Sequence, residues 1–131
     1  NQKPEVKFAL WLYNQSTTNI QSLCEHLKCP KDFQQIAELV SMWHHFASEF
    51  VDHRPQDILN FFLKSDGLRR QKRFEIILTT FDNLGINTAH IVQLQTLLNS
   101  IKISDLKNLN IAQELLEERL SVIARFLKST K

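Results

Sequence analysis

The chain has 131 residues, of which 43% are hydrophobic, and a formal net charge of +2. This is the size of one ordinary domain or of two small helical subdomains, with enough apolar material for a packed interior. Only two glycines and three prolines are present, too few for a chain of many short strands, so we expect long helices joined by short loops. No apolar run approaches the roughly 20 residues of a membrane span, and two isolated glycines exclude a glycine-rich nucleotide loop.

Helical periodicity covers almost the whole sequence, and a few residues mark where helices begin or end. Pro4 and Pro55 fit helix starts, where a missing N–H costs nothing. Gly85 fits the position just after a helix, where a left-handed residue ends it. The apolar spacing is typical of helix faces that pack inward. In chain order, the expected helices cover residues 4–13, 19–27, 30–54, 55–63, 68–84, 87–101 and 111–127, with a connector over 103–110.

These patterns predict an all-α protein of six or seven helices without a sheet. The turn at Ser65–Gly67 suggests two subdomains, residues 1–66 and 67–131, which are free to pack as one unit. The side chains expected in the core are Phe33, Ile36, Val40, Trp43, Ile58, Phe62, Ile77 and Phe81.

Positive charge is concentrated in the second half of the sequence. Residues 1–66 hold six Lys/Arg and eight Asp/Glu, whereas residues 67–131 hold ten and six. The densest run is Arg69, Arg70, Lys72 and Arg73, at an expected helix start, where the helix dipole disfavours cations. In the helix expected over 68–84, Arg69, Lys72 and Arg73 fall at i, i+3 and i+4 and so share one face, with Arg70 on its edge.

Two interpretations of this run stay open. It could form a surface that meets nucleic-acid phosphates, or a solvated face on which Lys72 or Arg73 pairs with Asp66 or Glu75. If the run is only a solvated face, the binding surface would lie elsewhere, for example around Lys102, Lys107 and Arg125.

No catalytic or metal-binding motif stands out among the titratable residues. None of the five histidines belongs to a recognised ligand motif. His44 lies on an apolar stripe and is expected to be a core histidine hydrogen-bonded to a neighbour. Cys24 and Cys29 lack the C-x-x-C spacing, so we expect free thiols in a reducing compartment, with a disulfide as the alternative. We therefore expect no catalytic residues and no metal site.

Several stretches, taken in order, carry a resemblance. They are VKFALWLY, LCEHLKCPKDFQQIAELV, WHH followed by HRPQDILNFF, DGLRRQKRFE, and finally IAQELLEERLSVIARF, with weaker agreement over residues 82–110. Together they resemble the helical body and tail of bacterial tRNA nucleotidyltransferases, the CCA-adding enzymes that carry an HD-type module.

The resemblance implies an HD-like fold without the hydrolase chemistry of that module. Tyr13 and Asn14 stand where the family has its His-Asp pair, and the His- and Gly-rich loop that follows in the family is replaced by a short connection. A metal-dependent phosphohydrolase needs those ligands. Residues 1–66 would thus be a degenerate HD-like subdomain with His44 as a remnant of its site, and residues 67–131 the body and tail.

The resemblance also implies a function. It suggests an RNA-binding piece of a CCA-adding enzyme that positions tRNA, with Arg69, Arg70, Lys72 and Arg73 against its phosphates. The family's nucleotidyl-transfer residues lie N-terminal to this sequence, so the piece itself would need no cofactor, and its parent would use Mg²⁺ with ATP and CTP.

We therefore expect a cytoplasmic fragment whose partners are tRNA and the catalytic head of the same chain. No membrane contact is expected, and a homo-oligomer is compatible with the sequence. The alternative is a protein–protein interaction or dimerisation module built on a degenerate HD-like bundle.

Overall fold

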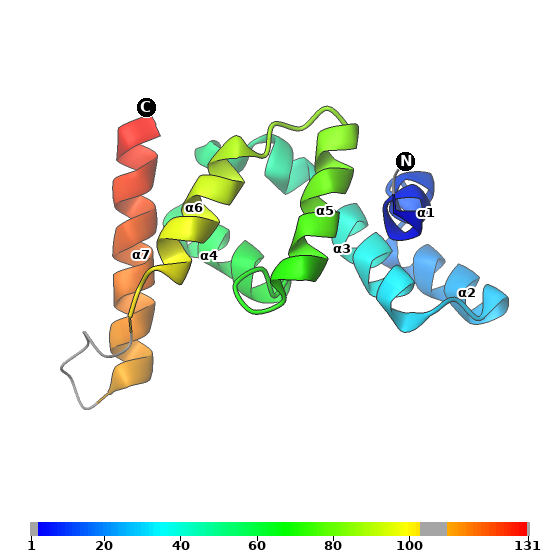
Figure 1. Ribbon diagram of the computed structural model, residues 1–131, viewed down its shortest axis with the longest axis horizontal. Helices are drawn as coiled ribbons and strands as arrows, with labels where there is room; N and C mark the ends of the chain where they lie inside the picture. The colour runs from blue at the N-terminus through cyan, green and yellow to red at the C-terminus, as the bar shows by residue number, and fades with distance from the viewer. Residues whose placement is uncertain (1–2, 103–109, 131) are drawn as a thin grey trace. The chain divides into compact units, whose positions relative to one another are not determined.

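The computed structural model describes residues 3–102 and 110–130, and over these residues the chain is helical, with no strand (Figure 1). This confirms the all-α prediction. The expected connector over 103–110 falls almost entirely outside the described residues. The helices are α1 (Pro4–Leu12), α2 (Thr17–Leu27), α3 (Lys31–Ser48), the 3₁₀ helix η1 (Phe50–Asp52), α4 (Pro55–Lys64), α5 (Gln71–Asn83), α6 (Ala89–Asn99) and α7 (Ile111–Thr130).

The chain forms two compact units, and each is discontinuous in sequence. Unit 1 comprises Asn1–Ser48 and Arg70–Thr88, and unit 2 comprises Glu49–Arg69 and Ala89–Lys131. This division differs from the expected subdomains 1–66 and 67–131. The reason is that α5, after the turn at residues 65–69, packs back against α1 and α3 instead of joining the C-terminal helices.

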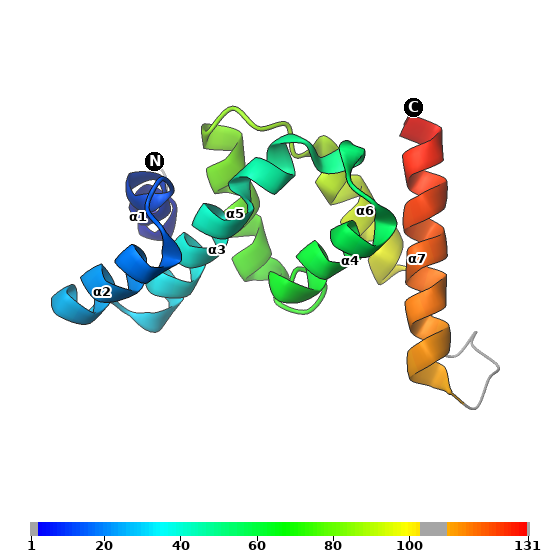
Figure 2. The same ribbon diagram turned by 180° about the vertical axis from the view of Figure 1, so that it is seen from behind.

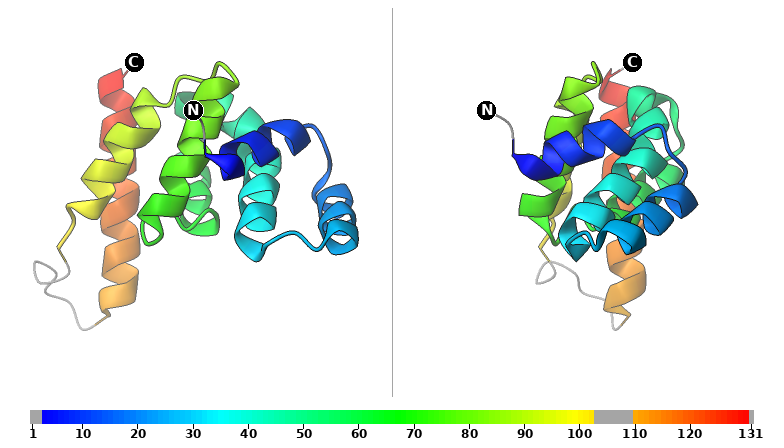
Figure 3. Two further views of the ribbon diagram at one scale, coloured as in Figure 1. Left: turned by 45° about the vertical axis from the view of Figure 1, so that its right-hand side comes forward. Right: turned by 90° about the vertical axis from the view of Figure 1, so that its right-hand side faces the viewer.

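Unit 1 is built on α1, α3 and α5, which pack against one another, with α2 added on α3. In Figure 3, α1 runs across the side of α3 and α5. Phe33 and Trp43, expected in this core, are only half-buried at its edge. The buried apolar side chains are Val6, Ala9, Leu12, Ile20, Cys24, Ile36, Ala37, Val40, Ala47, Phe74, Ile77, Leu78 and Phe81.

Unit 2 is built on α4, α6 and α7, with η1 packed against α6 (Figure 2). Phe50 of η1 meets two rings of α4 edge-on, with centroids 6.0 Å from Phe61 and 6.1 Å from Phe62. The buried apolar side chains are Phe50, Ile58, Leu59, Phe61, Phe62, Ile91, Leu94, Leu98, Ile123, Phe126 and Leu127.

Helix ends follow local chemistry where a cap is present. Ser16 accepts a hydrogen bond from the backbone N–H of Asn19 at 3.1 Å and so caps α2. Gly85 has φ +82° and ends α5, as predicted. Its N–H donates to the Asp82 carbonyl and that of Ile86 to the Phe81 carbonyl, the Schellman pattern. Within residues 3–102 and 110–130, no helix combines the length and the apolar character that a membrane span requires.

Candidate nucleic-acid interface

The basic run lies at the start of α5, but only part of it is helical. The helix begins at Gln71, and Arg70 before it is non-helical, with φ −98° and ψ 68°. The prediction that Arg69, Lys72 and Arg73 share one helix face is therefore wrong, because Arg69 lies in the preceding turn. Arg69 also belongs to unit 2, whereas the other three cations belong to unit 1.

In unit 1, α3 supplies the partners of these cations. Arg70 lies 3.8 Å from a carboxylate oxygen of Asp32, and its side chain is 44% exposed. The half-buried Arg73 donates a hydrogen bond of 3.3 Å to the side-chain oxygen of Gln35. Lys72 is exposed and makes no ion pair with a described residue. Arg70 and Arg73 thus both contact α3, a helix whose position beside α5 no local pattern reveals.

In unit 2, Arg69 pairs with Asp66, whose carboxylate is 3.7 Å from the guanidinium. The Arg69 side chain is 83% exposed. Ion pairs this exposed contribute about 0–1 kcal/mol, so Arg69 and Arg70 can exchange their carboxylates for phosphates at little cost.

The backbone at the start of α5 adds to the positive potential. No side chain caps this helix, and its first turn contains no acidic residue. The first N–H groups of a helix have no acceptor within the helix and carry the positive end of its dipole. Arg70 and Lys72 therefore stand beside a backbone feature that also attracts anions.

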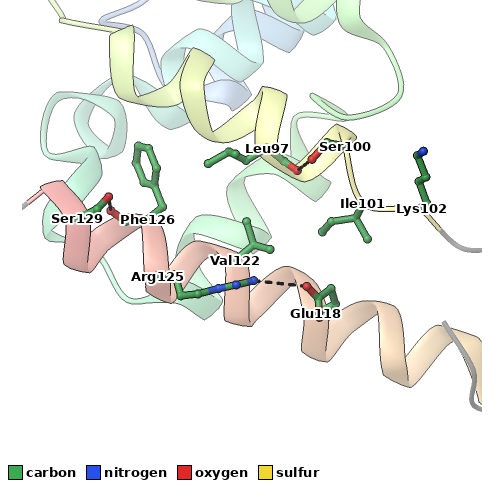
Figure 4. Close-up of a pocket in the computed structure, with 9 residues that line it drawn as sticks. All are labelled: Leu97, Ser100, Ile101, Lys102, Glu118, Val122, Arg125, Phe126 and Ser129. Atoms are coloured by element: carbon green, nitrogen blue, oxygen red, sulfur yellow. Dashed lines mark hydrogen bonds and ion pairs between the residues drawn. The ribbon is translucent and has the colours of Figure 1, made fainter. Parts of the chain in front are cut away.

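The alternative basic set lies partly in a groove between α6 and α7 of unit 2 (Figure 4). The groove has a volume of about 550 Å³. Arg125 lies 3.5 Å from Glu118 on its wall, and Lys102 extends beyond the end of α6. Lys107 lies outside the described residues. The lining side chains are Leu97, Ser100, Ile101, Lys102, Glu118, Val122, Arg125, Phe126 and Ser129.

Tyr13 and His44, which the resemblance associated with a lost metal site, lie in contact in unit 1. Their ring centroids are 5.2 Å apart and the rings are nearly perpendicular, while the ring centroid of His45 lies 4.1 Å from that of His44. Burial lowers the pKa of His44, and the neighbouring His45 lowers it further. His44 is half-buried and not in the core as expected, and the hydrogen bond expected for it is not seen with any described residue; it makes ring contacts instead. Asn14 is exposed.

The possible metal ligands and the two cysteines form a further group of candidate residues. Among the described residues, no three His, Cys, Asp or Glu side chains gather closely enough to hold a metal ion. Cys24 and Cys29 are free thiols, as expected. Burial raises the pKa of the Cys24 thiol to about 11, with a contribution from its hydrogen bond to Cys29, so Cys24 is a poor nucleophile.

Comparison with known proteins gives consistent relatives. The chain is 30% identical over 110 residues to the CCA-adding enzyme of Coxiella burnetii, a match that covers 81% of this chain and 28% of that protein. It is 34% identical over 56 residues to the multifunctional CCA protein of Nitrosococcus oceani and over 59 residues to that of Neisseria meningitidis serogroup B. These two matches cover 43% and 45% of the chain and 14% of each relative.

The chain thus spans just over a quarter of the length of the Coxiella relative. No family model and no solved structure matches it.

Proposed function

We propose that this chain, which is related to a region of CCA-adding enzymes, is the helical part of such an enzyme that binds and positions tRNA. The observation that carries the proposal is the exposed basic start of α5 in a chain with these relatives. The names of the relatives point to tRNA as the substrate. Arg69, Arg70, Lys72 and Arg73 are the residues proposed to meet tRNA phosphates.

The support for these cations is rigid. Phe74, Ile77 and Phe81 follow them on α5, and all three are at most 1% exposed. A helix anchored in this way presents Arg70 and Lys72 from a fixed position, which lowers the entropy cost when they bind. Recognition through backbone phosphates reads the shape of the RNA instead of its sequence.

The chemistry of CCA addition is proposed to take place elsewhere in the parent protein. A catalytic head using Mg²⁺ with ATP and CTP would add the nucleotides, and this part would hold the tRNA so that its 3′ end reaches that head. The N-terminal helices would be an HD-like module in which Tyr13 and Asn14 replace the metal-binding pair. The expected cytoplasmic location accords with this role.

Charge reversal at the start of α5 tests the proposal. In the 131-residue chain, Arg70→Glu with Lys72→Glu should weaken tRNA binding, and the log–log dependence of affinity on salt should flatten by roughly 0.7–0.9 for each phosphate that is no longer neutralised. The matched control is Lys64→Glu with Lys128→Glu, two exposed lysines of unit 2 with the same total charge change. Equal weakening in the two variants would mean that only net charge matters, and absence of tRNA binding by the unmodified chain would refute the proposal.

One observation favours a second candidate, a protein-interaction module. An apolar groove of about 290 Å³ lies between α4 and α7, lined by Gln56, Leu59, Asn60, Leu63, Leu116 and Leu120. Leu63 is 51% and Leu116 40% exposed, and neighbouring exposed leucines of this kind are typical of interaction surfaces. Concentration-dependent self-association in sedimentation equilibrium, together with no affinity for tRNA, would favour this candidate.

A further inference from the structure

Trp11 is the most exposed large apolar side chain that the structure describes. The indole is 65% exposed, although it lies on α1, a helix that buries Val6, Ala9 and Leu12 on its other side. Tryptophan is highly buried on average. An indole left this open on a well-packed helix is a surface on which a flat group can stack.

The indole of Trp11 is also held in place by a neighbouring aromatic ring. The ring of Phe8 meets Trp11 edge-on, with centroids 6.2 Å apart and an angle of 66°. The same Phe8 ring meets Phe33 of α3 in the same manner at 5.7 Å. Trp11 is therefore the outer end of a row of three aromatic rings in unit 1. Because its side chain is already held by these contacts, a group that stacks on it would cost little additional side-chain entropy.

A cation lies on or beside each of the two helices that carry this aromatic row. Lys7 lies one turn before Trp11, at the i, i+4 spacing that places two side chains on one helix face, and it is exposed without an ion pair to a described residue. On α3, Asp32, which precedes Phe33 in the sequence, lies 3.8 Å from Arg70. Aromatic rings flanked by cations are the arrangement that binds single-stranded nucleic acid, since rings take the bases and cations the phosphates.

We propose that Trp11 is a stacking platform for one unpaired base of a bound RNA, with Lys7 at the adjacent phosphate. The inference rests on the proposed RNA-binding function and adds to it a preference for a kind of RNA. Cations need only phosphates and so bind a duplex as well as a single strand, whereas a base can stack on Trp11 only if it is not already stacked within a helix. Trp11 should thus contribute to the binding of RNA with unpaired nucleotides and not to the binding of a blunt duplex.

The test compares two RNA probes, an oligouridylate of about 12 nucleotides and a blunt RNA duplex of about 12 base pairs, long enough for a single binding site. In the full 131-residue chain, Trp11→Ala should weaken oligouridylate binding by roughly 5- to 150-fold, the range for removal of one stacked base. It should leave duplex binding and the salt dependence unchanged. Trp11→Phe should retain most of the affinity because it keeps an aromatic face, and Lys7→Gln should flatten the salt dependence of strand binding.

A spectroscopic arm separates stacking from an indirect effect on folding. The chain has two tryptophans, so Trp43→Phe leaves Trp11 as the sole indole, and oligouridylate should quench its fluorescence. If Trp11→Ala binds oligouridylate as the unmodified chain does, the inference is refuted while the proposed function stands. If no RNA binds at all, both fail. If Trp11→Ala changes only self-association, the occupant of this surface is a protein and the inference fails.

Discussion

At the scale of single residues, the most informative contact is that between Tyr13 and His44. The resemblance suggested that both mark a position where an HD-type module would hold a metal ion. In unit 1 they pack ring to ring, and His45 lies against His44. These neighbours favour a neutral His44 imidazole, because burial disfavours the charged form.

This contact predicts a pH dependence of stability. The pKa of His44 is lowered in the folded chain, whereas in the unfolded chain it should return to about 6.5. As pH falls below that value the unfolded chain takes up the proton first, so the free energy of unfolding decreases until pH is below the lowered pKa. Above about pH 7 the residue has no such effect.

Urea unfolding at about pH 7.5 and about pH 5.5, on either side of the pKa of an unperturbed histidine, measures this effect. The decrease in stability between the two pH values should be smaller in His44→Gln than in the unmodified chain. The control is His26→Gln, which removes an exposed imidazole of α2. An identical pH dependence of the His44→Gln variant and the unmodified chain would contradict the prediction.

At the scale of helices, sequence-based prediction worked best where the backbone chemistry is local. Pro4 and Pro55 begin helices and Gly85 follows the end of one, as their fixed or permissive φ angles predicted. The prediction of one helix over 30–54 was wrong at its C-terminal end, since α3 ends at Ser48 and a 3₁₀ helix begins at Phe50. An apolar residue at position 50 satisfies a helical pattern equally well. What decides is its packing on Phe61 and Phe62, which no local pattern contains.

The candidate site shows the same limit. The density of charge at residues 69–73 was visible in the sequence, but Asp32 and Gln35 each lie 38 residues before their partners Arg70 and Arg73. The exposure of Trp11 was equally hidden, because a wide apolar face on a helix such as α1 is normally buried. In both cases the missing information is which helix packs beside which.

Two helix ends of the same type allow a matched prediction. Gly85 after α5 has φ +82°, and Asp66 after α4 has φ +58°, each with the two backbone hydrogen bonds of a Schellman ending. An added Cβ at Gly85 would meet no atom within 4 Å, so only the backbone conformation opposes it. Gly85→Ala should therefore lower the free energy of unfolding by about 1–2 kcal/mol.

Asp66→Gly should have the opposite sign, because glycine adopts this conformation freely. Urea unfolding followed by circular dichroism measures both changes. Gly85→Asn is the control, since asparagine tolerates a left-handed backbone better than alanine, and equal destabilisation by Asn and Ala at this position would count against the conformational explanation.

At the scale of the whole molecule, the interleaved units change the meaning of the charge pattern. The excess of cations in the second half of the sequence is divided between the two units, because each unit contains residues from both halves. When residues are assigned to the units, Lys and Arg exceed Asp and Glu by one in each. Any preference for a polyanion must therefore come from local arrangement, as at the start of α5, and not from the net charge of one unit.

The units also predict which fragments can fold. Residues 1–66 lack Ile77 and Phe81, which complete the core of unit 1, and residues 67–131 lack Ile58 and Phe62 of unit 2. Neither fragment should show cooperative unfolding on its own. A fragment of residues 1–88 contains all of unit 1 and should unfold cooperatively. Thermal unfolding by circular dichroism distinguishes these cases, and a cooperative transition of residues 1–66 alone would overturn the division.

The same interleaving constrains how the chain folds as it is synthesised. The chain passes from one unit to the other three times, so α4 leaves the ribosome before α6 and α7, with which it forms unit 2. Its apolar residues Ile58, Phe61 and Phe62 are synthesised with Phe50 but before α7, which packs against α4 in unit 2. All of unit 1 is consequently synthesised before unit 2 is complete, and during that interval the apolar face of α4 is exposed surface of the kind that promotes aggregation of nascent chains.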